Sequence, residues 1–315
     1  MSRLLALFAL FLGVPSLAAA QPLITPAELS ARLAEPQLRI VDIRDGKDDA
    51  GRSPYEVGHI AGALSAPYSK WRGPKDNPGR LPSEDALTAV IQKLGIDAAT
   101  PVVVVYEGTN ATDFGAAARV YWTLKASGVQ NLSILNGGVK AWRAANLPLT
   151  TDVTAVTPSR YVAKIDPKLV ATQEEVARVI GNENWRLLDA RPSAFFLGET
   201  RHVAAKTPGT LVGAKNVDNA VWFAKGSGAL LPTSDVKRIA QEAGVQADQP
   251  TVSFCNTGHW AATNWFVLSE VLGQKDVKLY PESTVGWSNA DLPMANVPNR
   301  LAQFWLQLRE ATGNL

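Results

Sequence analysis

The stretch at residues 253–262, SFCNTGHWAA, contains the single cysteine of the chain, Cys255. It ends a short apolar run and is followed by a loop that carries Gly258. A lone cysteine is either a small buried apolar side chain or a reactive thiol that acts as a nucleophile. A disulfide within the chain is excluded, so both interpretations stay open until the surrounding residues are considered.

The residues after Cys255 favour the reactive thiol. A buried strand is predicted to end at the cysteine, and a helix is predicted to begin near Ala261. A short loop between them can turn backbone N–H groups inward as an anion-binding nest, and the helix N-terminus adds partial positive charge. Gly258 permits backbone conformations that other residues avoid. We expect this loop to stabilise a thiolate at Cys255.

The two halves of the chain carry the same motifs in the same order. The matched pairs are residues 38–44 with 186–191, 58–63 with 209–214, 81–85 with 231–235, 101–106 with 250–255, and 141–149 with 286–294. The repeat predicts an N-terminal domain over 21–150 and a homologous C-terminal domain over 167–315, joined by a linker over 151–166.

Strands and helices are predicted to alternate in each half. Apolar runs at 102–105 and 251–254 suit parallel strands that are buried on both faces. Helices are expected at 116–127 and 261–272, with a longer loop from Glu107 to Gly115 in the first half. The alternation predicts an α/β fold in which each domain is an open, mostly parallel sheet flanked by helices.

The N-terminus predicts export. Arg3 precedes an apolar run at 4–14, and three alanines at 18–20 give a small-residue cleavage pattern. These features are typical of a secretory signal peptide over 1–20, which is too short to span a bilayer as a helix. An uncleaved anchor is the alternative. We expect a mature protein outside the cytoplasm, periplasmic in a Gram-negative bacterium, with no membrane association.

The composition is that of an ordinary globular protein of about two domains. The 315 residues are 46% hydrophobic and 19% charged, and the net charge is +2. The chain has no basic block, which argues against nucleic acid as a partner.

These motifs together resemble the tandem-domain rhodanese family, the thiosulfate and 3-mercaptopyruvate sulfurtransferases. The resemblance covers nearly all of the mature chain. It rests on the Asp-x-Arg strand ends, the GHIAGA motif at 58–63, the Cys-x-x-Gly loop and the tryptophan-bearing last helix of each half. It implies that only the C-terminal rhodanese-like domain carries the nucleophile. Tyr106 stands at the matching position of the N-terminal domain, which is therefore expected to be catalytically silent.

The resemblance also implies a ping-pong sulfurtransferase reaction. The Cys255 thiolate would take a sulfane sulfur from an anionic donor, thiosulfate or 3-mercaptopyruvate, and pass it from a persulfide to cyanide or a thiol. No metal or organic cofactor is implied. The expected active-site loop consists of Asn256, Thr257, Gly258, His259 and Trp260.

The chain departs from the family's pattern around this loop. The loop has neither the basic residues of the thiosulfate enzymes nor the Gly-Ser-Gly-Val-Thr pattern of the mercaptopyruvate enzymes. Phe195 replaces the family's arginine, Thr210 replaces a histidine, and Pro281-Glu282-Ser283 replaces an Asp-Gly-Gly or Asp-Gly-Ser segment.

Another basic residue is therefore needed to hold an anionic donor. The candidates are Arg72, Arg191, Arg201 and Lys206. Arg72 is the leading candidate, and its alternative is an exposed loop residue. For Arg191 the alternative is a structural ion pair with a nearby acid.

Some readings of the site stay open. His259 either donates to a bound anion or lies in a surface loop, and Trp260 either walls the pocket or packs at the helix start.

Phosphoryl transfer is disfavoured because Ala261 and Ala262 stand where a phosphatase needs an arginine. A non-enzymatic exported sulfane-sulfur carrier or anion-binding protein is the main alternative, and a redox-sensing thiol is another.

Overall fold

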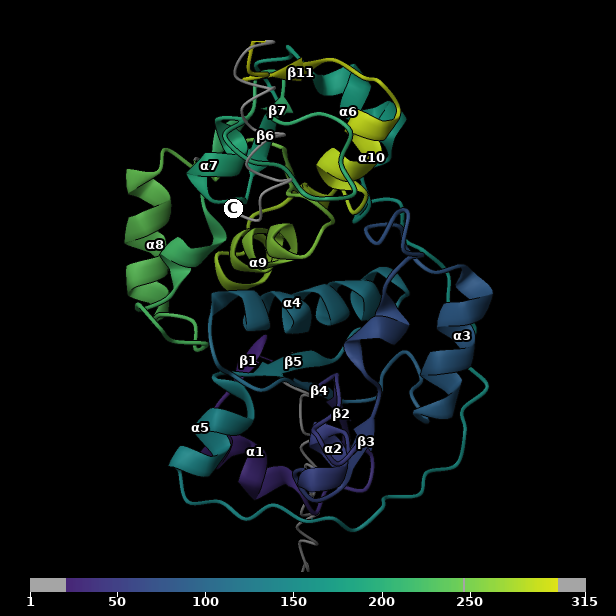
Figure 1. Ribbon diagram of the computed structural model, residues 1–315. Helices are drawn as coiled ribbons and strands as arrows, with labels where there is room; N and C mark the ends of the chain where they lie inside the picture. The colour runs from purple at the N-terminus through teal and green to yellow at the C-terminus, as the bar shows by residue number, and fades with distance from the viewer. Residues whose placement is uncertain (1–20, 246, 300–315) are drawn as a thin grey trace, which may run out of the picture.

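The computed structural model describes residues 21–245 and 247–299 (Figure 1). The predicted signal peptide at 1–20 lies outside the described residues, as does the end of the predicted C-terminal domain. Two lobes stand one above the other, the N-terminal one below and the C-terminal one above in Figure 1.

The N-terminal lobe is built on a five-stranded parallel sheet in the order β1-β5-β4-β2-β3. Its strands are β1 (Leu23–Ile24), β2 (Arg39–Asp42), β3 (Ala63–Ser65), β4 (Val102–Val105) and β5 (Leu132–Leu135). All four residues of β4 are buried, as expected for a central strand that is covered on both faces.

Helices cover both faces of this sheet. They are α1 (Pro26–Arg32), α2 (Pro54–Val57), the 3-10 helix η1 (Tyr68–Trp71), α3 (Glu84–Lys93), α4 (Ala111–Ala126) and α5 (Gly138–Ala144). The predicted long loop from Glu107 to Gly115 is wrong. The side chain of Asn110 accepts from the Asp113 N–H and caps α4, so the helix begins at Ala111.

The C-terminal lobe repeats the arrangement with a four-stranded parallel sheet in the order β10-β9-β6-β8, beside an antiparallel pair β11-β7. The strands are β6 (Arg186–Asp189), β7 (Thr210–Leu211), β8 (Lys215–Asn216), β9 (Thr251–Phe254), β10 (Val277–Leu279) and β11 (Met294–Ala295). The prediction of two α/β domains with open parallel sheets flanked by helices is confirmed.

The helices of this lobe are α6 (Gln173–Val179), α7 (Ser193–Phe196), the 3-10 helix η2 (Asn219–Trp222), α8 (Thr233–Glu242), α9 (Trp260–Phe266) and α10 (Ser283–Asn289). The helix predicted at 261–272 begins as α9 and continues as a π-helix, η3 (Val267–Val271). In the described ranges no helix has the length and apolar character needed to cross a membrane.

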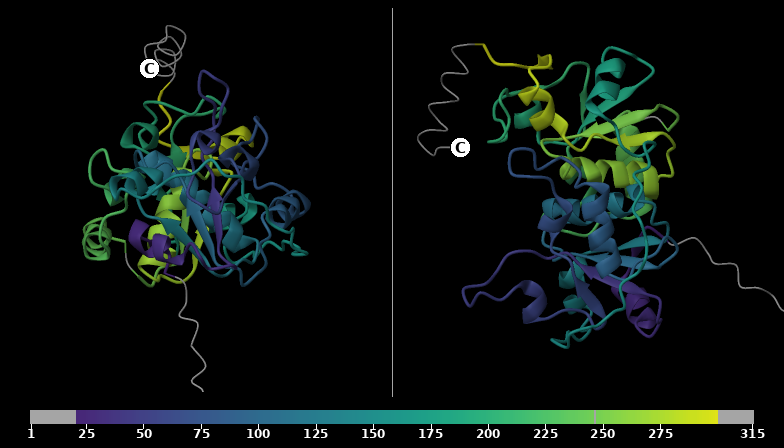
Figure 2. Two further views of the ribbon diagram at one scale, coloured as in Figure 1. Left: turned by 90° about the horizontal axis from the view of Figure 1, so that it is seen from below. Right: turned by 90° about the vertical axis from the view of Figure 1, so that its right-hand side faces the viewer.

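The two lobes meet along α4 and α9, which lie side by side (Figures 1 and 2). The ring of Phe266 lies edge to face with Phe114 and Tyr121, with centroids 5.6 and 5.0 Å away. The Tyr121 hydroxyl and the Lys125 ammonium both donate to Glu270, at 2.7 and 2.6 Å. A single buried apolar cluster contains residues of both domains, so the interface is a shared core.

Candidate active site

Cys255 directly follows β9, at the carboxyl edge of the C-terminal sheet, and is 1% exposed. The loop that it begins ends at His259, where α9 starts. The N–H groups of Cys255 and Gly258 both donate to the Ser283 hydroxyl, at 3.0 and 3.1 Å. That hydroxyl in turn donates to the Tyr280 carbonyl at 2.8 Å. One side chain from the start of α10 therefore fixes the curvature of the loop.

Ser283 is a residue whose contribution the sequence analysis missed. Its backbone has a φ of 52°, and Gly138, the corresponding residue of the other domain, has a φ of 59°. The correspondence follows from equivalent bonds, because Val139 N donates to Tyr106 O as Thr284 N donates to Cys255 O. A non-glycine residue in this region costs about 1 kcal/mol, a strain that is typical of functional sites. The sequence did contain a signal for this role, because Ser283 stands where the N-terminal domain has Gly138.

The remaining backbone donors of the loop are available to an anion. Within the described ranges, the N–H groups of Asn256, Thr257, His259 and Trp260 have no protein acceptor. Gly258 has a φ of +66°, and a Cβ there would collide with the Arg119 guanidinium and the Pro281 carbonyl. The predicted need for glycine is therefore real. Consecutive free N–H groups beside a thiol are the arrangement of an anion-binding nest.

Arg191 is committed to the protein itself. Its guanidinium forms a buried ion pair with Asp189 at 2.6 Å and donates to the Gly209 carbonyl at 2.7 Å. A further N–H donates to the Asn256 Oδ1 at 3.2 Å. Arg191 therefore forms the structural ion pair that was the alternative for it. It positions the loop through Asn256, so donor binding needs another residue.

The N-terminal domain repeats this ion pair with different neighbours. Arg44 binds Asp42 and the Gly58 carbonyl, each at 2.7 Å, and also forms an ion pair with Glu107. Asn256 is the C-terminal counterpart of Glu107, because each follows the residue at the strand end. The active loop thus has a neutral amide where the repeat has a carboxylate. A carboxylate at this place would oppose a negative charge on the neighbouring sulfur.

Tyr106 occupies the strand end that corresponds to Cys255. Its hydroxyl donates to the Gly228 carbonyl of the other domain at 2.6 Å and accepts from the Gly137 N–H at 3.1 Å. Burial raises the pKa of Tyr106 above its usual range. This residue is a neutral contact between domains, and the catalytic silence of the N-terminal domain stays a prediction.

Arg72 reaches the loop from the N-terminal domain. Its guanidinium donates to the Thr257 hydroxyl at 2.8 Å and to the Tyr68 hydroxyl at 3.1 Å. Among the described residues no carboxylate forms an ion pair with Arg72. The other two candidates are engaged elsewhere, because Lys206 pairs with Asp291 and Arg201 donates to the Ala205 carbonyl. Arg72 is therefore the candidate that contacts the cysteine loop.

His259 and Trp260 fasten the start of α9 to the start of α4. His259 Nε2 donates to the Thr112 carbonyl at 2.7 Å, so its Nδ1 accepts from the Tyr68 hydroxyl at 2.7 Å. The indole N–H of Trp260 donates to the Thr112 hydroxyl at 3.0 Å. Both ring nitrogens of His259 are thus occupied by protein groups, and the expected donation to a bound anion has no free N–H to use.

Two further residues lie near the loop. The Phe195 ring, at the position where the family pattern has arginine, stands edge to face with Trp260, with centroids 5.8 Å apart. His202 had no role in the sequence analysis, but it lies close enough to Arg72 for that charge to act on it. Burial first, and then Arg72, lower the pKa of His202.

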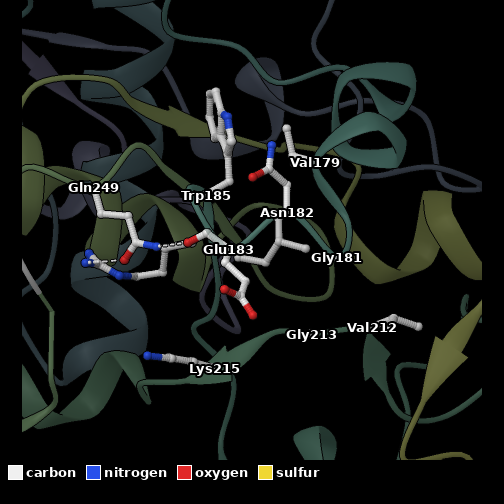
Figure 3. A pocket seen from close by; sticks show the side chains of 11 residues that line it. Val179, Gly181, Asn182, Glu183, Trp185, Val212, Gly213, Lys215 and Gln249 are labelled. Atoms are coloured by element: carbon white, nitrogen blue, oxygen red, sulfur yellow. Dashed lines mark hydrogen bonds between the residues drawn. The ribbon is translucent and has the colours of Figure 1, made fainter.

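A cavity of about 390 Å³ lies elsewhere in the C-terminal domain (Figure 3). It is lined by Trp185, Arg186 and Lys215, among others, at the amino ends of β6 and β8. Gln249 closes one side by accepting from Arg186 at 3.0 Å. Since Cys255 follows the carboxyl end of β9, this cavity is not part of the cysteine site. No group of three or more possible metal-ligating residues occurs in the described part of the chain.

The half-buried His259 side chain, with both ring nitrogens bound, predicts a pH-dependent stability. Burial, followed by the charge of Arg72, lowers the pKa of His259 to about 4. The unfolded chain, with a histidine pKa of about 6.5, takes up the proton first, so stability that is present above that pH is lost as the pH falls towards 4. We expect His259 to contribute on the order of 2–3 kcal/mol to this loss.

The measurement is the free energy of unfolding in urea at pH 7 and pH 4.5 for the wild type and for His259→Gln. The carboxylates that titrate in this range are the same in both proteins, so their effect cancels in the difference. The variant should lose less stability on acidification than the wild type. Equal losses in the two proteins would contradict the assignment.

Comparison with known proteins agrees with this geometry. The rhodanese-like domain family matches residues 25–145 and 172–290. A thiosulfate sulfurtransferase of Azotobacter vinelandii is 30% identical over 84% of this chain and 93% of its own length. A 3-mercaptopyruvate sulfurtransferase of Rattus norvegicus is 30% identical over 77% of this chain and 80% of its own. The Escherichia coli SseA structure, described as a 3-mercaptopyruvate sulfotransferase, superposes with a TM-score of 0.72 at 25% identity and covers 84% of this chain and 99% of SseA. The chain belongs to the rhodanese family, with two rhodanese-like domains in tandem.

Proposed function

We propose that this protein is a sulfurtransferase in which Cys255 carries a sulfane sulfur as a persulfide. The donor is a small anion, thiosulfate or 3-mercaptopyruvate, and the acceptor is cyanide or a thiol. The observation that carries the proposal is the free, buried thiol at the end of β9, in a loop whose N–H groups are available to an anion. The sulfurtransferase relatives, which match over both domains, support the same reaction type.

The first half of the reaction loads the sulfur. The Cys255 thiolate attacks the outer sulfur of thiosulfate, the sulfur–sulfur bond breaks, and sulfite leaves with the electron pair. With 3-mercaptopyruvate the carbon–sulfur bond breaks instead, and the carbon takes up a proton to give pyruvate. In the second half the acceptor attacks the terminal sulfur and regenerates the thiolate. Cyanide gives thiocyanate and a thiol gives a new persulfide, so no external oxidant is needed.

The loop is suited to the anionic intermediate. The N–H groups of the nest offer hydrogen bonds to a persulfide, whose charge lies one atom farther from the backbone than the charge of the thiolate. Arg72, which belongs to the N-terminal domain, adds a cation beside Thr257 of the cysteine loop. Phe195 and Trp260 form an edge-to-face pair at the start of α9, beside the loop. We assign donor binding to Arg72 and the nest, and sulfur transfer to Cys255.

Replacement of the nucleophile tests the reaction. Cys255→Ser should remove all thiocyanate formation from thiosulfate and cyanide, because the chain has no second thiol. Mass spectrometry of the wild type after incubation with the donor alone should show one added sulfur on Cys255. A non-enzymatic carrier would also gain the sulfur but would not turn over with acceptor, and a redox sensor would form oxidised species instead. Turnover by a folded Cys255→Ser variant would contradict the proposal.

Replacement of Arg72 tests donor binding. Arg72→Ala should raise the KM for the donor roughly tenfold, since loss of one charge-assisted hydrogen bond of about 1.4 kcal/mol has that effect. Lys70→Ala is the matched control, because Lys70 is an exposed cation on the short helix η1, which Arg72 directly follows. The KM for cyanide should change less than the KM for the donor. A donor KM within about twofold of the wild type would remove Arg72 from the site.

We also propose that the chain is exported, on the evidence of residues 1–20 alone. Expression of the full chain in a Gram-negative host should place the protein in the periplasmic fraction with Gln21 as its first residue. Deletion of residues 2–20 should leave it in the cytoplasm. Recovery of the uncleaved chain in the membrane fraction would favour the anchor instead.

A further inference from the structure

Arg119, on α4 of the N-terminal domain, is a fully buried arginine. Its guanidinium donates to the carbonyl of Gly258 at 3.1 Å, to that of Thr257 at 3.4 Å and to that of Gly79 at 2.8 Å. The Nε of Arg119 has no hydrogen-bond partner among the described residues. The Cζ of Arg119 lies 5.0 Å from the centroid of the Trp122 ring. The N-terminal domain thus places a cation in contact with the cysteine loop.

No carboxylate in the described part of the chain contacts this cation. Arg44 and Arg191, which are also buried, each form an ion pair with an aspartate. Arg119 has only neutral carbonyl acceptors and an aromatic face. A buried cation without an anion is costly, so such a group is expected to have a counter-charge in at least one functional state.

The groups that act electrostatically on Arg119 come from two elements. Tyr68 lies on η1 and Arg72 directly follows it, while Cys255 begins the loop and His259, which the charge of Arg119 also affects, ends it. Burial, followed by the like charge of Arg72, lowers the pKa of Arg119 to about 9, and the anionic forms of Tyr68 and Cys255 act in the opposite direction. Arg119 therefore keeps its charge at neutral pH. Cys255 is the member of this group whose proposed reaction makes it an anion at every turnover.

The bonds to Arg119 also orient the loop. In a trans peptide the C=O and the N–H point in opposite directions. Since the Gly258 carbonyl points at Arg119, the His259 N–H of the same peptide points away from it and has no protein acceptor. The Thr257 carbonyl likewise faces Arg119, and the Gly258 N–H on the other side binds Ser283. Arg119 thereby holds two carbonyl dipoles away from the side on which the N–H groups are offered.

We propose that Arg119 is a positioning residue of the sulfur site, which supplies the counter-charge for the anionic sulfur on Cys255 and orients the loop carbonyls. The inference rests on the proposed function, because it takes the thiolate and the persulfide of Cys255 as the working states. It assigns to the N-terminal domain a positive charge that the residues of the loop, 255–260, do not supply.

The first test follows the reactivity of Cys255 towards iodoacetamide as a function of pH. In Arg119→Met the pH of half-maximal alkylation should rise by about one unit relative to the wild type. Arg119→Lys keeps the charge and should show a smaller rise. Lys125→Met is the matched control, since it removes one positive charge from the same helix at a residue that binds Glu270 and not the loop. It should titrate like the wild type.

The second test needs no substitution of Arg119. Cys255→Asp and Cys255→Asn place an ionisable carboxyl group and its neutral isostere at the same position. With Arg119 present, the Asp variant should have the higher melting temperature at pH 7, because its charge is opposed by the buried guanidinium. When the same two substitutions are made in Arg119→Met, the difference in melting temperature should disappear or change sign. If Arg119→Met does not fold, the same comparison is made in Arg119→Lys, where the advantage of Asp over Asn should shrink, and an undiminished advantage would count against Arg119.

Two outcomes would overturn the inference. One is a folded Arg119→Met variant whose alkylation midpoint lies within about 0.2 unit of the wild type. The other is a Cys255→Asn variant that is as stable as Cys255→Asp, or more stable. Neither experiment uses a sulfur donor, so failure here is distinct from failure of the proposed function, which would appear as absence of sulfur loading on Cys255 in the wild type.

Discussion

The packing of α4 against α9 is the constraint on which the cysteine site depends. The two helices share one apolar core, so the domains cannot separate without exposing large aromatic side chains such as Phe114 and Phe266 to water. Both helices also begin at the loop. Thr112 at the start of α4 binds His259 and Trp260, and Arg119 binds the loop carbonyls about two turns farther along the same helix. The geometry of the loop is therefore a property of the domain pair.

The duplicated fold shows how one copy of the site differs from the other. Both domains keep the same aspartate–arginine pair at the end of a central strand. At that strand end a buried tyrosine stands in the first domain and a thiol in the second. The carboxylate of Glu107 is replaced by the amide of Asn256, and Gly138 is replaced by Ser283, whose hydroxyl binds two loop N–H groups. The change from glutamate to asparagine removes a negative charge beside the sulfur. The change from glycine to serine adds a hydroxyl dipole that is fixed by its hydrogen bonds.

The distribution of charge agrees with an anionic substrate and an anionic intermediate. Arg72 and Arg119 both contact the loop, and neither forms an ion pair with a carboxylate within the described residues. Their mutual repulsion opposes the folded state unless an anion lies nearby, which agrees with a site that holds a thiolate, a persulfide or a donor. Arg191, by contrast, is neutralised by Asp189 and acts only through Asn256. The site thus contains one arginine that is paired with an aspartate and two that, among the described residues, are bound only by neutral groups.

The sequence by itself determined the repeat, the order of strands and helices, and the place of Cys255 at a strand end, because these follow from local apolar runs and glycine positions. It also named Gly258, which has a positive φ, and Arg72, which contacts the loop, while the role of Arg72 stays a prediction. It did not give the start of α4, since the capping bond of Asn110 outweighed the loop pattern. Only the tertiary structure decided the partners of His259, Trp260 and Arg191. It alone placed Arg119, because the acceptors of that guanidinium at Gly79, Thr257 and Gly258 come from distant parts of the chain, which are joined only when the two domains pack together.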